Sequence, residues 1–192
     1  DSSDLVGYTL YLDLLGSLAT NKQKHAFQLG EEKQRVIAAL NLASEGKKVA
    51  LISSGDPGIY AMASLVFDCI SQTDNLNWKR LEIHVSPGIS ALQACSALVG
   101  APIGHDFCAI SLSNLLTPWA VIEKRLTKAC EGDFVIALYN PTSKKRGGNF
   151  QTALGLLKRY YKPTTPVSVG TSLGRPEEEV IITSLMNLDK EA

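Results

Sequence analysis

Residues 47–70, KKVALISSGDPGIYAMASLVFDCI, constrain the fold more than any other part of the chain. Val49–Ile52 is a short apolar run with the character of a strand buried on both faces. The chain then turns through residues 53–58, and apolar residues recur beyond the turn at helical spacing. Asp56 suits the N-cap of that helix and Pro57 its first position. The stretch predicts a strand, a glycine-bearing loop and a helix that faces the carboxyl edge of a sheet, where open α/β sheets bind ligands.

The loop at residues 53–58 allows two interpretations. Glycine and aspartate are ordinary turn residues, so a plain connection is as well supported as a ligand site. A phosphate-binding loop would read G-x-x-x-x-G-K-[ST] and a dinucleotide loop G-x-G-x-x-G, and this loop has neither pattern. The carboxylate of Asp56 stands where an anion would otherwise bind, and no lysine follows it. The loop therefore points away from ATP and NAD and towards hydroxyl donors or a cation.

Composition excludes several classes of partner. The formal net charge of zero gives no electrostatic footprint for nucleic acid or an anionic membrane. No apolar run approaches the length of a membrane span, and no secretory signal is visible. The four cysteines have no C-x-x-C spacing and lie among apolar residues, which predicts buried thiols in a reducing cytoplasm and no metal site. The 192 residues suffice for one large domain or two small ones.

A second unit repeats the plan of the first. Residues 81–85, LEIHV, predict another strand, followed by a Ser-Pro-Gly turn and a helix over residues 89–99. This repetition predicts a mostly parallel sheet with right-handed crossovers. Residues 100–107 break helix and strand alike and are the candidate linker. The predicted architecture is therefore α/β with two domains, residues 1–107 and 108–192.

The remaining elements are predicted from periodicity and turn signals. Residues 5–8 read as a strand end or a loop, and residues 21–29 as a loop. Three helices are expected: one over residues 31–44, one that begins after an N-cap at Thr117, and one over residues 150–161. Strands are expected at residues 108–112, 134–139, 166–169 and 180–184. The last of these strands is expected to run antiparallel to its neighbour.

Several motifs together resemble the tetrapyrrole methylase superfamily. Residues 53–60 look like its glycine-aspartate-proline loop, and residues 87–91 are similar to its second signature. Residues 100–107, 115–119 and 138–141 (GAPIGHDF, LLTPW and LYNP) resemble the precorrin-3B C17-methyltransferases, a ring-contracting family within that superfamily. The later three segments are the more selective, and the resemblance covers nearly the whole chain.

The resemblance implies a fold and an activity. The fold is a two-domain α/β protein, usually a homodimer, with mostly parallel or mixed sheets and S-adenosylmethionine bound between the domains. The activity is methyl transfer to C17 of precorrin-3B, or of its cobalt form, with contraction of the ring in cobalamin biosynthesis. The family pattern also begins with a strand and a Gly-x-Gly-Pro-Gly loop, which we expect to precede residue 1.

The resemblance further implies which residues meet the cofactor. Asp56 would offer its carboxylate, Tyr60 would pack behind the loop, and residues 171–173 would close over the adenine. A carboxylate without a lysine suits a methyl donor that has cationic sulfonium and ammonium groups and no phosphate. The expected cofactor-binding residues are Ser54, Gly55, Asp56, Ile59, Tyr60, Ser90, Ala91, Tyr139, Asn140, Thr171 and Leu173.

Two further groups are candidates for chemistry at the macrocycle. Ring contraction calls for acid/base assistance, and His105 and Asp106 are the only neighbouring histidine and carboxylate in the chain. A plain hydrogen-bonding role at the linker is an equally supported interpretation. Lys144, Lys145 and Arg146 either form a solvated basic loop or meet the substrate's acetate and propionate groups.

Other functions stay open at this point. The nearest is another corrin-pathway methyltransferase of the same superfamily; the more distant is a corrin-intermediate binding module without catalysis. Neutral charge argues against a ribosomal RNA substrate. The segments containing His-Asp-Phe and Leu-Thr-Pro-Trp argue against a diphthine substrate. The oxygen-dependent and the cobalt-early pathways are both compatible with the sequence.

Overall fold

The computed structural model describes residues 2–141 and 147–188. By their internal contacts the residues group into two compact units, Asp1–Ser90 and Ala91–Ala192. The predicted α/β class is confirmed, because both units contain sheets against which helices pack. The sequence places the domain boundary after residue 107 instead, and that boundary stays a prediction.

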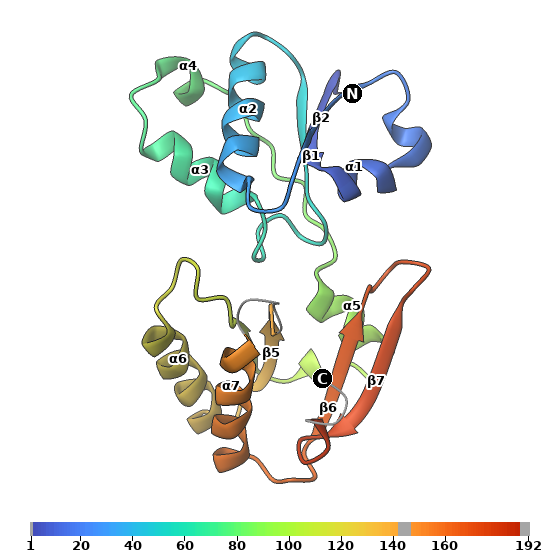
Figure 1. Ribbon diagram of the computed structural model, residues 1–192, viewed down its shortest axis with the longest axis vertical. Helices are drawn as coiled ribbons and strands as arrows, with labels where there is room; N and C mark the ends of the chain where they lie inside the picture. Colours follow the sequence, from blue (N-terminus) through green and yellow to red (C-terminus); the bar gives the residue numbers. More distant parts are fainter. Residues whose placement is uncertain (1, 142–146, 189–192) are drawn as a thin grey trace. The chain divides into compact units, whose positions relative to one another are not determined.

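The first unit contains a three-stranded parallel sheet (Figure 1). Its strands are β1 (Asp4–Tyr8), β2 (Gln23–Phe27) and β3 (Val49–Ile52), in the order β2-β1-β3. The predicted strand β3 is confirmed, although it is half-buried rather than buried on both faces. β1 is a complete central strand, not a strand end or a loop, and its first four residues are buried.

The prediction of a loop over residues 21–29 is wrong. Residues Gln23–Phe27 pair along their whole length with β1, from Asp4↔Gln23 to Tyr8↔Phe27. β2 lies at the edge of the described sheet and alternates between exposed and half-buried positions over most of its length. An edge strand tolerates polar residues because much of its surface meets water, so its composition resembles that of a loop.

Helices cover the sheet of the first unit. They are α1 (Thr9–Leu14), the 3₁₀ helix η1 (Gly16–Ala19), α2 (Glu32–Ser44), α3 (Ala63–Ser71) and α4 (Leu76–Lys79). The predicted helix over residues 31–44 is confirmed. Val36 and Leu40 of α2 form a buried cluster with Met62 and Val66. The helix expected to start at Pro57 starts at Ala63 instead, so Asp56 is not its N-cap.

The predicted strand at residues 81–85 is also wrong. Residues 81–90 form neither helix nor strand. The alternation seen in the sequence is nevertheless real: Leu81 and Ile83 pack against the Val36 cluster, while the side chains of Glu82 and His84 are 86% and 84% exposed. The pattern reported which side chains face the core, but a strand also needs a paired backbone, and none of the described strands pairs with this segment.

The second unit contains two pairs of strands. β4 (Phe107–Ser111) runs parallel to β5 (Val135–Tyr139), and β6 (Pro166–Thr171) runs antiparallel to β7 (Glu179–Ser184). All four strands were predicted, including the antiparallel pair. The helical elements are α5 (Ala91–Leu98), the 3₁₀ helix η2 (Pro102–Gly104), α6 (Trp119–Glu131) and α7 (Gly147–Tyr160). The N-cap of α6 is Pro118, one residue after the predicted Thr117.

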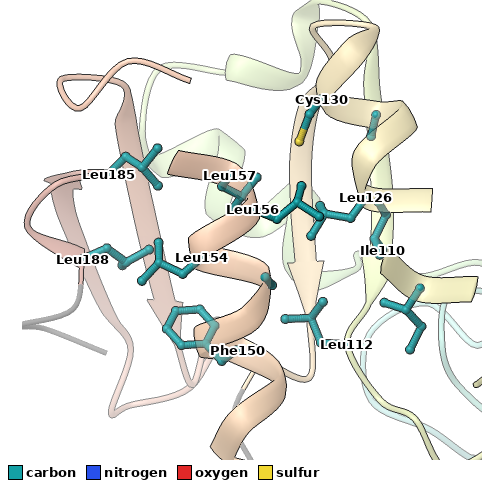
Figure 2. Close-up of a cluster of buried hydrophobic side chains, with 13 residues drawn as sticks. Ile110, Leu112, Leu126, Cys130, Phe150, Leu154, Leu156, Leu157, Leu185 and Leu188 are labelled. Atoms are coloured by element: carbon teal, nitrogen blue, oxygen red, sulfur yellow. The ribbon is translucent and has the colours of Figure 1, made fainter. Parts of the chain in front are cut away.

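The core of the second unit lies between α6, α7 and the strands (Figure 2). Leu126 of α6 is fully buried, and Leu154 of α7 is 1% exposed. Two leucines that follow β7 pack against α7 in the same cluster, Leu185 and Leu188. Burial raises the pKa of the Cys130 thiol here, so this cysteine is protonated at neutral pH and acts as a core residue.

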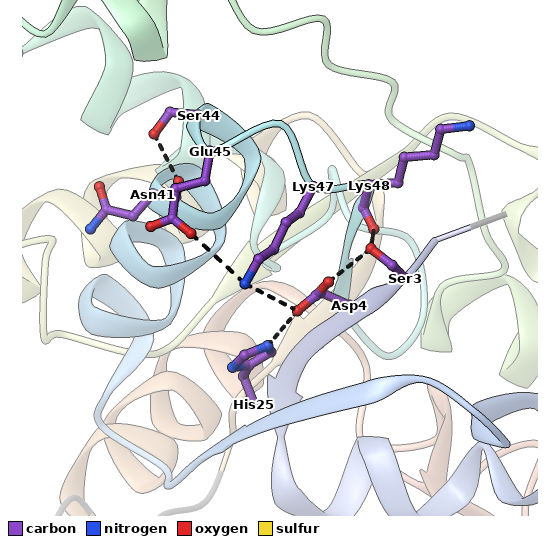
Figure 3. A network of polar contacts seen from close by, with 8 residues as sticks. All are labelled: Ser3, Asp4, His25, Asn41, Ser44, Glu45, Lys47 and Lys48. Carbon is purple, nitrogen blue, oxygen red and sulfur yellow. Dashed lines mark hydrogen bonds and ion pairs between the residues drawn. The ribbon is translucent and has the colours of Figure 1, made fainter.

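A polar network around Asp4, at the start of β1, links this strand to β2 and to the segment before β3 (Figure 3). Asp4 is 5% exposed and accepts hydrogen bonds from His25 Nε2 and Ser3 Oγ, both at 2.8 Å, while Lys47 Nζ lies 4.0 Å away. These two hydrogen bonds lower the pKa of Asp4 below its ordinary value of 3.8, and the bond from His25 has the larger effect. The charged form of Asp4 therefore stabilises the folded unit.

Asp4→Asn is expected to lower the melting temperature at neutral pH and to lose its effect in acid. The stabilisation from a lowered pKa is present above the unfolded value of 3.8 and disappears as the pH falls through the folded value. The difference in melting temperature between the wild type and the variant should therefore begin to shrink below about pH 4 and disappear only below the folded-state pKa of Asp4. Asp74→Asn, at an exposed position, is the matched control and should melt like the wild type throughout. A gap that stays constant from pH 7 to pH 3 would contradict the assignment.

Residues 2–141 and 147–188 contain neither a candidate membrane-spanning helix nor a candidate metal-binding cluster. No helix in these ranges has both the length and the apolar character needed to cross a membrane. No cluster of three or more His, Cys, Asp or Glu side chains in the same ranges is arranged to hold a metal ion.

Candidate functional site

The loop after β3 starts at the carboxyl edge of the parallel sheet. Asp56 organises this loop as a turn: its Oδ1 accepts a hydrogen bond from Gly58 N at 2.7 Å, and its carbonyl accepts one from Ile59 N at 3.1 Å. Ala63 N, at the start of α3, then donates to the Pro57 carbonyl at 2.9 Å. An aspartate that binds the backbone two residues on is a common turn former. The loop thus extends over residues 53–62 before the helix begins.

The turn at residues 86–90 packs directly on this loop. Gly88 N donates to Asp56 Oδ2 at 3.1 Å, so the two oxygens of one carboxylate serve two separate chain segments. A Cβ on Gly88 would lie 2.3 Å from the carbonyl oxygen of Gly55, a distance that real side chains essentially never reach. Gly55 itself has a φ of +73°, in the left-handed region. We call residues 53–62 and 86–90 the paired loops.

The structure brings together six of the predicted cofactor residues in or beside the paired loops. Ser54 and Gly55 are exposed, Asp56 and Ile59 are half-buried, and Ser90 is 2% exposed. The sixth is Tyr60, which was expected to pack behind the loop. It has a φ of +51° and is 51% exposed within the first unit.

The far end of the first loop is held by a residue that sequence reasoning missed. Arg35 of α2 is 3% exposed and donates from Nη2 to the Gln28 carbonyl at 3.1 Å, while its Nη1 lies 3.8 Å from Met62 Sδ. Its position next to Val36 in an amphipathic helix gave no sign of burial. Arg35 thus links the loop after β2 to the loop after β3.

In the second unit, α5 joins the carboxyl end of β5. Leu92 N, in the first turn of α5, donates to the hydroxyl of Tyr139 at 3.0 Å. Asn140 follows β5 and donates from Nδ2 to Ser111 Oγ, at the end of β4, at 3.0 Å. The predicted residues Ala91, Tyr139 and Asn140 therefore lie around one edge of the β4–β5 pair. Sequence spacing gave no signal for Leu92 and Ser111.

The turn after β6 packs against the same helix. A Cβ on Gly170 would lie 2.9 Å from Cδ1 of Leu173 and 3.2 Å from Sγ of Cys95 in α5. Leu173 and Cys95 therefore lie close together. Cys95 Sγ also lies 3.8 Å from Ser168 Oγ of β6. The predicted residues Thr171 and Leu173 are thus placed beside α5, as Tyr139 is.

The two candidate acid/base residues lie at the other end of the strands. His105 and Asp106 are exposed and precede β4, where the Asp106 carbonyl accepts a hydrogen bond from Val135 N at 3.0 Å. Tyr139 ends β5, four residues beyond Val135, which corresponds to about 13 Å along a strand. The hydrogen bond of Asp106 is made by its main chain, so it does not distinguish between the two roles that the sequence left open for these side chains. The catalytic role stays a prediction, and the activity of a His105→Ala variant tests it.

The candidate substrate-binding residues Lys144, Lys145 and Arg146 lie outside the described residues.

A family model matches this chain over residues 2–189: Tetrapyrrole (Corrin/Porphyrin) Methylases. Three curated relatives also align with nearly all of it. The chain is 46% identical over 187 residues to a probable cobalt-factor III C(17)-methyltransferase of Salmonella typhimurium, covering 97% of this chain and 76% of the relative. It is 43% identical over 188 residues to a precorrin-3B C(17)-methyltransferase of a Sinorhizobium species, covering 98% and 73%.

The third relative is considerably longer. It is a cobalt-factor III methyltransferase of Priestia megaterium, 43% identical over 191 residues, and the alignment spans 98% of this chain but only 35% of that protein. Among solved structures, the crystal structure of the methyltransferase CobJ superposes with a TM-score of 0.90 at 37% identity, covering 97% of this chain and 77% of that one. The fold, the family model and these relatives agree, and the chain belongs to the tetrapyrrole (corrin/porphyrin) methylase family.

Proposed function

We propose that the protein transfers a methyl group from S-adenosylmethionine to C17 of precorrin-3B, or of its cobalt form, with ring contraction in cobalamin biosynthesis. One observation carries the proposal: two relatives whose names specify C17 align with 97% and 98% of this chain at 46% and 43% identity. The CobJ structure supports it, since its match extends over 97% of the chain.

The paired loops fit such a methyl donor. The absence of a Cβ at Gly55 and Gly88 lets the two loops pack backbone against backbone, and Ser54 and Gly55 are exposed. No lysine stands at the loop to favour a phosphate. When bound, S-adenosylmethionine supplies an electrophilic methyl group on a sulfonium. The protein's part is then to hold donor and acceptor carbon in line, which is worth several orders of magnitude in rate.

We propose that the residues implied by the family resemblance contact the donor, those in the paired loops chiefly through backbone groups. The proposed contacts are Ser54, Gly55, Asp56, Ile59, Tyr60, Ser90, Ala91, Tyr139, Asn140, Thr171 and Leu173. The tetrapyrrole carries several carboxylates, and Lys144, Lys145 and Arg146 are the proposed partners for them. We further propose that the protein works as a homodimer in the cytoplasm, which keeps its free cysteines reduced.

The proposal is tested by incubating the protein with S-adenosylmethionine and either precorrin-3B or its cobalt form. The expected product is heavier by one methyl group, with the new carbon assigned to C17 by NMR, and S-adenosylhomocysteine accumulates in equal amount. A reaction without S-adenosylmethionine is the control. Methylation at another carbon would identify a different corrin-pathway methyltransferase. Tetrapyrrole binding without methyl transfer would identify a binding module instead. Light scattering of the same preparation tests the homodimer.

A further inference from the structure

We infer that Asp56 is a positioning residue: its carboxylate fastens the turn at Gly88 to the loop at Gly58, so that backbone groups of both segments form one surface for the methyl donor. The identity of the donor in this inference rests on the proposed function, whereas the contacts of Asp56 do not depend on it. It also changes the role that the sequence suggested for Asp56, which was to offer its charge directly to the cationic groups of the cofactor.

The hydrogen bonds of Asp56 carry the inference. One carboxylate oxygen accepts the Gly58 amide at 2.7 Å and the other accepts the Gly88 amide at 3.1 Å. Hydrogen bonds from amides to a charged carboxylate are stronger than those between neutral groups. Each oxygen of Asp56 therefore already has a donor within the protein.

The second segment depends on this link more than the first. The loop at residues 53–62 is continuous with β3 and α3, which fix both of its ends. Residues 81–90 form no strand and no helix, so no ladder of backbone hydrogen bonds sets the position of the turn. The hydrogen bond from Gly88 to Asp56 joins residues 32 positions apart and so fixes the turn against the first loop.

Close backbone packing explains why the link needs an aspartate and a glycine together. At Gly88 a side chain would reach 2.3 Å from the Gly55 carbonyl oxygen and 3.4 Å from Asp56 Cα. The short aspartate side chain spans the remaining gap between the segments. At Gly55 the position of a Cβ lies 3.7 Å from both the Ile89 carbonyl oxygen and Ser90 Cα. The predicted cofactor residues Gly55 and Ser90 are thus neighbours only while the turn stays in place.

The first experiment is an NMR titration of the full chain, and it does not depend on any ligand. If Asp56 accepts both amides, the amide proton signals of Gly58 and Gly88 should move upfield together as acid protonates the carboxylate. Asp68→Asn, at an exposed aspartate of α3, should leave this joint titration unchanged, whereas Asp56→Asn should abolish it. If the Gly88 signal in the wild type does not move with that of Gly58, the link is absent and the inference fails. The wild type alone decides this point, so a poorly folding variant does not block the test.

The second experiment separates positioning from direct charge recognition. Calorimetry gives the affinities of wild type and Asp56→Asn for S-adenosylmethionine, S-adenosylhomocysteine and methylthioadenosine. The first has a sulfonium and an ammonium, the second only the ammonium, and the third neither. A positioning residue should weaken all three by a similar factor, tenfold or more. A loss confined to the cationic ligands, with methylthioadenosine unaffected, would mean that Asp56 contacts the cofactor's charge and would overturn the inference. A wild type that binds none of the three contradicts the proposed function, while the titration still decides the role of Asp56.

Discussion

Replacing Gly88 by alanine is expected to reduce the affinity for S-adenosylmethionine at least tenfold while both units stay folded. The added methyl group would lie 2.3 Å from the Gly55 carbonyl oxygen and 3.1 Å from its carbonyl carbon. Both are backbone atoms that cannot rotate away, so the paired loops must separate by about 1 Å to restore van der Waals contact. Displacements of this size at a binding site cost up to about a hundredfold in rate. Calorimetry measures the affinity, and circular dichroism checks the fold.

Gly155→Ala is the matched control for this substitution. Gly155 lies in α7, and a Cβ there would meet nothing within 4 Å. Alanine also has a helix propensity about 1 kcal/mol better than glycine, so this variant should bind like the wild type and be no less stable. Unchanged affinity in a folded Gly88→Ala protein would show that the donor does not need the two loops in contact.

A double-mutant cycle connects this prediction with the role of Asp56. If Asp56 acts by holding Gly88, either substitution alone releases the turn, and the double variant should be little worse than the more damaging single one. If the two residues act independently, their effects on affinity should multiply. The cycle therefore tests the link between the loops through a functional readout.

The sequence was sufficient to predict most of the elements and the antiparallel pairing of β6 with β7, but not the pairing of segments further apart in the chain. β3, α2 and the strands of the second unit follow from apolar runs and periodicity, which report burial. Residues 21–29 and 81–85 were both misassigned, for opposite reasons. The first is polar yet pairs with β1, and the second alternates correctly yet has no strand beside it among the described residues. Pairing depends on neighbours distant in sequence, and a local pattern contains no information about them.

The candidate site shows the same division. The family signatures suggested Gly55, Ser90 and Tyr139, and this assignment stays a prediction. Gly55 and Tyr139 lie at the carboxyl ends of β3 and β5, where α/β sheets bind ligands, whereas no strand among the described residues directly precedes Ser90. The motifs did not show that the Asp56 carboxylate accepts a hydrogen bond from Gly88 N and does not cap a helix. They also did not show that Leu92 N donates to the Tyr139 hydroxyl. N-cap preference favoured Asp56 and Pro57 at a helix start, but the loop extends to Met62, and α3 begins only at Ala63. These contacts depend on tertiary packing that the order of residues does not reveal.

Leu126→Ala is expected to lower the free energy of unfolding by about 3 kcal/mol, in the range typical of buried leucines. Leu126 is fully buried in α6, within the cluster that also holds Leu112, which follows β4, and Phe150 of α7. The substitution removes three buried carbons, the Cγ methine and the two methyl groups, and leaves a cavity that the neighbouring helices fill only in part. Urea denaturation measures the loss as a shift of the midpoint at constant slope.

The control is the same change at Leu116, whose side chain is 96% exposed, and there the expected effect is within about 0.5 kcal/mol. A local readout comes from Cys130, which packs in the same cluster and is 6% exposed. Its thiol should react with a disulfide reagent faster in Leu126→Ala than in the wild type, because the weakened core opens more often. Equal losses for both leucines would contradict the core assignment.

Because this core also holds β4 and β5 against α6 and α7, its loosening should weaken the Asn140–Ser111 contact and with it the binding of the methyl donor.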